Sequence, residues 1–145
     1  MSIHLHAIEG LPEIRPGDDL GSLLASRVPG GPGILVVAQK IVSKAEGRSV
    51  ELATVTPSAR ALALATEVQK DPRLVELILS ESVRVVRSRP NVLIVEHRLG
   101  FVMANAGIDQ SNVGPTDGVE RALLLPVDPD GSAARLRTAL AASAG

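Results

Sequence analysis

Apolar positions along the chain recur with two periods, which predict strands and helices in the same protein. Ile3, Leu5 and Ala7 alternate with polar residues and predict a short strand. The continuous apolar run 34–38 follows glycine and predicts a strand buried on both faces. Further strands are predicted over 83–89, 92–96 and 101–104, with 98–100 as a hairpin connection.

Four helices are predicted, three of them from capping signals. Asp19 precedes leucines at helical spacing, and Thr56-Pro57 opens an alanine-rich stretch that continues to about Lys70. Asp71-Pro72 repeats the same start signal, and a last helix is predicted over about 132–142. Hairpins mixed with paired helices indicate an α+β fold with a largely antiparallel sheet and flanking helices. Strict alternation of strands and helices is absent, so a Rossmann-like fold is disfavoured, and we expect one domain over 1–145.

Composition narrows the classes of function. The 145 residues include one Phe and no Trp, Tyr or Cys, so the core must be aliphatic and neither disulfides nor thiolate metal sites can form. The formal net charge is −1 without a basic block, which argues against nucleic acid as a partner. The first residues do not resemble a signal peptide and no apolar run is long enough to span a bilayer, so we expect a cytoplasmic protein that is not bound to a membrane.

A basic stretch directly after the apolar run 34–38 is the first candidate binding segment. It places Lys40, Lys44 and Arg48 within nine residues. Lysine binds phosphate as a point charge and arginine binds it bidentately. The alternative is a solvated amphipathic turn. A Walker A loop is excluded because its glycine and Lys-Ser/Thr pattern is missing.

Two further polar stretches are candidates. Residues 105–112 surround the carboxylate of Asp109 with amides, small residues and a hydroxyl, which suits a magnesium-type ion that is also held by nucleotide phosphates. The alternative is an Asx-turn. Residues 9–14 form a turn that could also wall a nucleotide base. His4 and His6 are interpreted as a surface pair, His97 is expected to face solvent, and no zinc site is assigned.

Four blocks, in order along the chain, resemble the coenzyme F-420-0:L-glutamate ligase family. They cover essentially the whole sequence, and a chance match to all four in order is very improbable. The blocks are Gly10-Leu11-Pro12-Glu13 with Pro16 to Leu20, Val36 to Arg48, Ala104 to Val113, and Leu123 to Pro126 with Asp128-Pro129-Asp130.

This resemblance implies an acid–amino-acid ligase. Such enzymes use GTP to phosphorylate the terminal carboxylate of F-420-0, and L-glutamate then attacks the acyl phosphate to give an amide, GDP and phosphate. It also implies Mg or Mn, stimulation by K in many members, and a homodimer. Carried over by motif, the nucleotide contacts are expected at Leu11, Pro12, Glu13, Ile14, Gln39, Lys40, Lys44 and Asn112, the metal ligand is expected at Asp109, and Lys44 and Asp109 are expected to act in catalysis within one shared cleft.

One departure from the family pattern affects these expectations. Members of the family continue into a second lobe, whose Asp-Thr-x-Gly-Arg stretch and later glutamine complete the metal cluster, and nothing in this chain matches those motifs. Three explanations compete: a truncated sequence, one half of a split enzyme that needs a partner chain, or a degenerate module. The alternative function is accordingly a non-catalytic GTP-binding or scaffolding half-domain.

Overall fold

Polar capping residues start the helices in the computed structural model of the chain, which describes residues 2–111 and 117–143. Asp19 caps α1 (Leu20–Ala25) by accepting hydrogen bonds from the Ser22 amide and hydroxyl at 3.1 and 2.6 Å. Asp71 caps α4 (Pro72–Ser80), as predicted, by accepting from the Arg73 amide at 2.8 Å. The cap of α3 (Ala59–Val68) is Ser58, so the start predicted at Thr56 is wrong.

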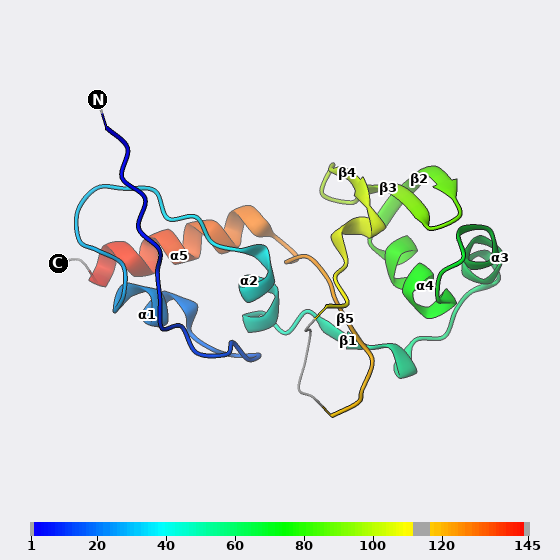
Figure 1. Ribbon diagram of the computed structural model, residues 1–145, viewed down its shortest axis with the longest axis horizontal. Helices are drawn as coiled ribbons and strands as arrows, with labels where there is room; N and C mark the ends of the chain where they lie inside the picture. Colours follow the sequence, from blue (N-terminus) through cyan, green and yellow to red (C-terminus); the bar gives the residue numbers. More distant parts are fainter. Residues whose placement is uncertain (1, 112–116, 144–145) are drawn as a thin grey trace. The chain divides into compact units, whose positions relative to one another are not determined.

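Internal contacts divide the chain into two compact units. The terminal unit comprises the residues up to Gly47 together with those from Pro126 onward, and the middle unit comprises Arg48–Leu125. The terminal unit contains α1, α2 (Gln39–Ala45) and α5 (Pro129–Ser143), labelled in Figure 1. The helix α5 starts earlier than predicted because proline suits a first helical position and the Asp128 carboxylate accepts from the Gly131 amide at 3.0 Å.

Two small antiparallel sheets form the middle unit, together with α3, α4 and the 3₁₀ turns η1 (Leu52–Thr54) and η2 (Asn105–Gly107). The strand β1 (Ser49–Glu51) pairs with β5 (Arg121–Leu123). The other sheet has the order β2 (Ser82–Arg89), β3 (Val92–His97), β4 (Val102–Ala104), as the hairpin pattern predicts. The α+β class with antiparallel sheets and flanking helices is therefore confirmed.

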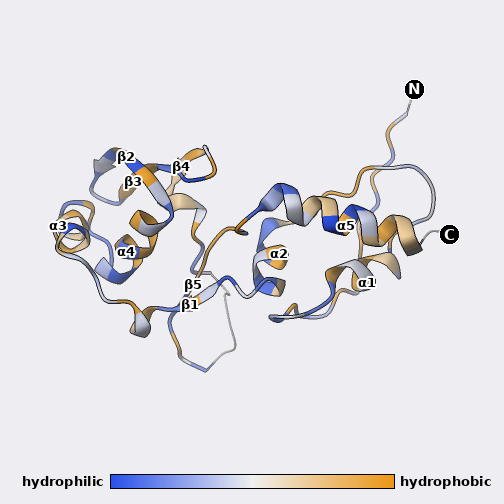
Figure 2. Cartoon of the chain, turned by 180° about the vertical axis from the view of Figure 1, so that it is seen from behind, coloured by the Kyte–Doolittle hydropathy of each residue, from blue (hydrophilic) through white to orange (hydrophobic). Residues whose placement is uncertain are grey.

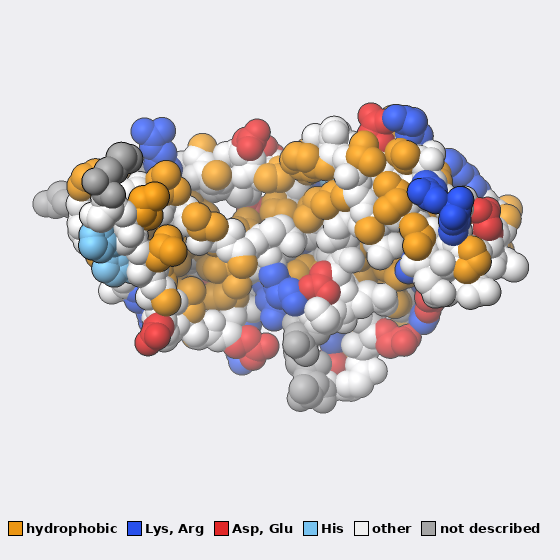
Figure 3. Space-filling model, turned by 45° about the horizontal axis from the view of Figure 1, so that its top comes forward, with side chains coloured by type: hydrophobic (Ala, Val, Ile, Leu, Met, Phe, Trp, Pro, Cys, Tyr) orange, Lys and Arg blue, Asp and Glu red, His pale blue; other side chains and the backbone are white. Residues whose placement is uncertain are grey.

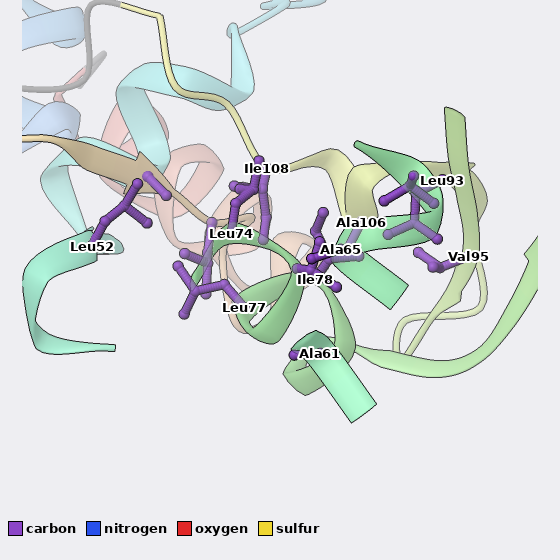
Figure 4. Packing of buried hydrophobic residues seen from close by; sticks show 14 residues of the cluster. Leu52, Ala61, Ala65, Leu74, Leu77, Ile78, Leu93, Val95, Ala106 and Ile108 are labelled. Atoms are coloured by element: carbon purple, nitrogen blue, oxygen red, sulfur yellow. The ribbon is translucent and has the colours of Figure 1, made fainter. Parts of the chain in front are cut away.

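The core of the middle unit lies between this sheet and the two helices. Leu93 and Val95 point inward from β3, and Ile78 of α4 is fully buried against the same cluster, as Figure 4 shows. Their alternation with the half-buried or exposed Val92 and Ile94 is the period of two expected of a sheet with one covered face. Burial of such aliphatic side chains is the main stabilising term for a core without aromatic residues.

The terminal unit has a separate and smaller core formed by Ile14, Leu20 and Leu24, against which Leu136 and Leu140 of α5 pack. A Cβ added at Gly21 would lie 2.6 Å from the Cβ of Ala139, so α1 and α5 approach closely because residue 21 lacks a side chain. Among the helices of the described ranges, none combines the length and apolar character needed to cross a bilayer.

Two predicted strands in the terminal unit are wrong. Residues 3–7 and 34–38 form no strand, and no other described segment pairs with them in a ladder. Leu35 and Val37 pack on the core of the terminal unit, but Ile34 and Val36 are 94% and 88% exposed. The apolar run is therefore covered on one side and exposed on the other. The prediction failed because a buried strand needs paired strands at both edges and cover on both faces.

Candidate functional site

Residues 11–14, predicted to contact a nucleotide, belong to no helix or strand and precede α1 along the chain. Ile14 is only 5% exposed and belongs to the core of the terminal unit, while Leu11 packs against that core from the side. Pro12 and Glu13 are exposed. A ligand at this segment would therefore meet the backbone and the side chains of Pro12 and Glu13, because Ile14 is used in packing.

The basic stretch forms the helix α2, not the start of a loop after a strand. Within it Gln39 donates to the Ser43 hydroxyl at 2.5 Å, and Ser43 is buried. Lys40 and Lys44 are four residues apart, so they lie on one face of the helix. Lys44 is half-buried, and no described residue forms an ion pair with its ammonium group. A half-buried cation of this kind gains from an anionic ligand.

The terminal unit brings these two predicted segments together. The Gly17 amide donates to the Ala45 carbonyl at 2.8 Å, which ties the loop after Ile14 to the last turn of α2, next to Lys44. Ile41 and Val42 of α2 pack on the same cluster as Ile14. All predicted nucleotide contacts except Asn112 therefore belong to one unit.

Arg48, the third cation of the basic stretch, has a structural role. Its Nε donates to the Leu125 carbonyl at 2.8 Å, and its guanidinium pairs with Glu81 at 3.1 Å. These contacts lie inside the middle unit, so Arg48 stabilises the fold of that unit.

The stretch around Asp109 has an unusual backbone. Asn105, Ala106 and Gly107 have φ values of 52°, 53° and 68°, so three consecutive residues are left-handed. Two of them carry a Cβ, and such strain persists only where the surroundings enforce it. Asp109 follows and is fixed by a two-way bridge to Leu123, with hydrogen bonds of 3.0 and 2.7 Å. The carboxylate of Asp109 is thereby placed at one end of β5.

The side chain of Asp109 also forms the Asx-turn that was the alternative interpretation. Its Oδ1 accepts from the amide and the hydroxyl of Ser111 at 2.8 and 2.7 Å. A carboxylate can hold a cation while it accepts such bonds, because its two oxygens offer several lone pairs. Within the ranges 2–111 and 117–143, no group of three His, Asp or Glu side chains could hold a metal ion. A metal ion at Asp109 therefore stays a prediction.

Asn112, the remaining predicted nucleotide contact, lies outside the described residues. Lys44 belongs to the terminal unit and Asp109 to the middle unit. Their meeting in one cleft therefore stays a prediction.

A buried charged cluster in the middle unit was not predicted. His97 was expected to face solvent, which is wrong: its side chain is 0% exposed, and its Nε2 lies 3.5 Å from the Glu81 carboxylate. The Leu99 amide donates to Nδ1 at 3.0 Å, so the proton of the neutral imidazole is assigned to Nε2. Arg48 and Arg98 pair with the same Glu81 oxygen at 3.1 and 3.2 Å.

The titration of His97 follows from its position in this cluster. Burial lowers the pKa of His97 below the ordinary 6.5, and the neighbouring Glu81 carboxylate opposes this shift without cancelling it. The sequence carried a signal for this burial. His97 continues the inward alternation of Leu93 and Val95, and that period should have outweighed its place beside a hairpin.

Comparison with known proteins assigns the chain to a family. A family model described as F420-0:Gamma-glutamyl ligase matches residues 10–145. A coenzyme F420:L-glutamate ligase of Methanothermobacter thermautotrophicus is 44% identical, over 100% of this chain and 58% of the relative. Relatives of the same name from Halobacterium salinarum and Natronomonas pharaonis are 45% and 48% identical, over 99% and 92% of this chain and 57% and 54% of their own lengths. The chain thus spans little more than half the length of these relatives, and it belongs to the F420-0:gamma-glutamyl ligase family.

Proposed function

We propose that this chain provides the nucleotide-binding part of a ligase that joins L-glutamate to F-420-0 with GTP and a divalent metal ion. The observation that carries the proposal is the 44% identity over the whole chain to a coenzyme F420:L-glutamate ligase. The half-buried Lys44 and the loop of Asp109 supply groups of the kind that phosphate and a cation need.

The reaction requires activation because a carboxylate does not react with an amine directly. In the proposed sequence, a carboxylate oxygen of F-420-0 attacks the γ-phosphorus of GTP, and GDP leaves. The glutamate nitrogen then attacks the acyl carbon, the acyl C–O bond breaks, phosphate leaves, and the nitrogen loses a proton. In the net reaction, the P–O bond to the γ-phosphorus of GTP and one C–O bond of the carboxylate break, while the C–N bond of the amide and a P–O bond of the released phosphate form. Conversion of GTP to GDP and phosphate drives the ligation.

The residues of this chain would act by position and charge. Lys44 would place its ammonium against phosphate oxygens and reduce the repulsion that an incoming carboxylate meets. Lys40 lies on the same helical face and would add a second positive charge. Pro12 and Glu13, with the backbone of Leu11 and Ile14, would border the nucleoside. Gln39, the first residue of α2, would contact the nucleotide.

Asp109 would contribute one carboxylate to a divalent cation, which when bound to the nucleotide neutralises phosphate charge and polarises the transferred group. Asn112 would contact the nucleotide beside it. Because the relatives are longer, we propose that turnover also needs the part of the family fold that this chain does not cover. A homodimer is proposed as the assembled form.

The test measures GTP binding and GTP turnover coupled to F-420-0 and L-glutamate. Both are measured for this chain alone and with a polypeptide that carries the rest of a full-length relative. We expect GTP binding in both samples and turnover in the second. Lys44→Ala should weaken GTP binding at least several-fold. Lys70→Ala is the matched control, because Lys70 is also a half-buried lysine and is not among the predicted nucleotide contacts.

The role of Asp109 is tested by the metal dependence of turnover. Asp109→Ala should abolish the response to Mg or Mn, while Asp130→Ala on α5 should leave it intact. An unchanged metal response in Asp109→Ala would refute the metal assignment. GTP binding without turnover in either sample would instead support a non-catalytic GTP-binding scaffold.

A further inference from the structure

The outward face of the three-stranded sheet in the middle unit carries a row of arginines. The pairing register places Arg84 opposite Glu96, Arg87 opposite Ile94, and Arg89 opposite Val92. These residues share one face because the inward positions of β3 are Leu93, Val95 and His97. The arginines of β2 therefore border an apolar surface on the side of the sheet away from the core, and Figure 2 shows hydrophilic residues of β2 beside hydrophobic residues of β3.

Among the residues that the structure describes, a carboxylate forms an ion pair with one of the three arginines. Arg84 pairs with Glu96 at 2.6 Å. Arg87 and Arg89 are exposed, and neither forms an ion pair within the described part of the chain. They are two residues apart on a regular stretch of strand, which separates their Cα atoms by about 6.6 Å. The pair offers two guanidinium groups at a regular spacing to an external anion.

The same register links this pair to the loop of Asp109. Arg87 lies opposite Ile94, and Ile94 lies opposite Ala104, so the three residues form one row across the sheet. Neighbouring strands are about 4.8 Å apart, so the backbone of Arg87 lies about 10 Å from that of Ala104. Ala104 leads directly into Asn105 and the left-handed turn before Asp109. A ligand a few bonds long could reach from this turn to Arg87.

The chemistry of a γ-glutamyl ligase suggests which anion this is. A glutamate joined through its γ-carboxyl group keeps its α-carboxylate, so a tail of such residues carries one negative charge per repeat. Guanidinium groups bind carboxylates in a bidentate manner, and aliphatic residues beside them suit the methylene groups of the tail. Figure 3 shows Lys and Arg side chains next to apolar side chains over the middle unit.

We propose that Arg87 and Arg89 bind the α-carboxylates of a γ-linked glutamate tail on the acceptor substrate, across the outward face of β2 and β3. This proposal rests on the ligase function proposed above. It assigns the acceptor tail to the middle unit. The two arginines would then influence the length of the glutamate tail that the protein binds. Charged residues on an edge strand also deter edge-to-edge association, so the experiment must separate the two roles.

The experiment measures the affinity of the full chain for fluorescently labelled γ-linked glutamate oligomers of increasing length. We expect wild-type affinity to rise with length and to fall with added salt. Arg87→Ala and Arg89→Ala should each weaken binding of the longer oligomers by about two- to fivefold, the range for exposed ion pairs, and the double variant should lose the dependence on length. Arg87→Lys with Arg89→Lys should restore part of it.

Arg60→Ala is the matched control, because Arg60 is an exposed arginine on α3 of the same unit. An equal loss in this control, an unchanged double variant, or a wild-type affinity that ignores tail length would overturn the proposal. Equal binding of α-linked glutamate oligomers would overturn the assignment to γ-linked tails. A change in sedimentation without a change in binding would show that the arginines serve only to prevent association. The GTP turnover assay is independent, so loss of the ligase function would be seen separately.

Discussion

Glu81 is expected to be the most sensitive charged residue of the middle unit, and Glu81→Gln removes its charge while keeping its shape. Its side chain is 12% exposed, and one oxygen lies 3.1 Å from Arg48, 3.2 Å from Arg98 and 3.5 Å from His97. Loss of one partner from a fully buried pair costs about 3–5 kcal/mol, and loss of a surface pair costs about 0.2–1 kcal/mol.

The exposure of the arginines that pair with Glu81 places the expected cost of Glu81→Gln between these limits. Arg48 and Arg98 are 21% and 34% exposed, so water can partly replace the carboxylate. We expect a loss of about 2 kcal/mol in the free energy of unfolding, roughly 8–16 °C in the midpoint if the middle unit unfolds alone.

The assay is urea denaturation followed by far-UV circular dichroism, with Glu96→Gln as the matched control. Glu96 pairs with Arg84, which is 63% exposed, so that variant should lose less than about 1 kcal/mol. Equal losses in the two variants would refute the reasoning, because burial of the cluster would then contribute nothing.

Two further predictions concern His97 and Gly107. Burial lowers the pKa of His97, so the unfolded chain takes up a proton near pH 6.5 while the folded chain does not. The free energy of unfolding is therefore retained above pH 6.5. Below pH 6.5 it falls with a slope of up to about 1.4 kcal/mol per pH unit. Urea midpoints from pH 8 to 5 should show this fall in the wild type and a shallower one in His97→Gln, and parallel curves would contradict it. Gly107→Ala adds a Cβ at φ +68°, 3.1 Å from Leu125, and should cost about 1–2 kcal/mol for the backbone and more for the contact. Gly100→Ala, at φ +86° with nothing within 4 Å, isolates the backbone cost, so an equal loss in both would argue against the contact.

Local signals predicted the middle unit well and the terminal unit poorly. Asp71-Pro72 and the hairpin at 98–100 determine their elements with neighbouring residues alone, so the sequence suffices to find them. The run 34–38 has the composition of a buried strand, but its state depends on whether another segment pairs with it, and that information is not local.

The candidate site follows the same division. The positions of Lys40 and Lys44 on one face of α2 could be predicted only after the segment was identified as a helix. The burial of His97 follows from the alternation of β3, but its contact with the Glu81 carboxylate joins two residues distant in sequence and could not be predicted. The left-handed turn at Asn105 and Ala106 is hardest to predict. Asparagine tolerates this conformation, but alanine does not favour it, so tertiary packing has to enforce it at Ala106.

The two ends of the middle unit lie side by side. The Leu124 amide donates to the Arg48 carbonyl at 3.1 Å, and Ser49 lies opposite Leu123 in the ladder of β1 and β5. On the ribosome, this unit has its full set of elements once Leu125 has emerged, whereas the terminal unit must wait for α5. We therefore expect the middle unit to fold before the terminal unit during synthesis, although the terminal unit begins nearer the N-terminus.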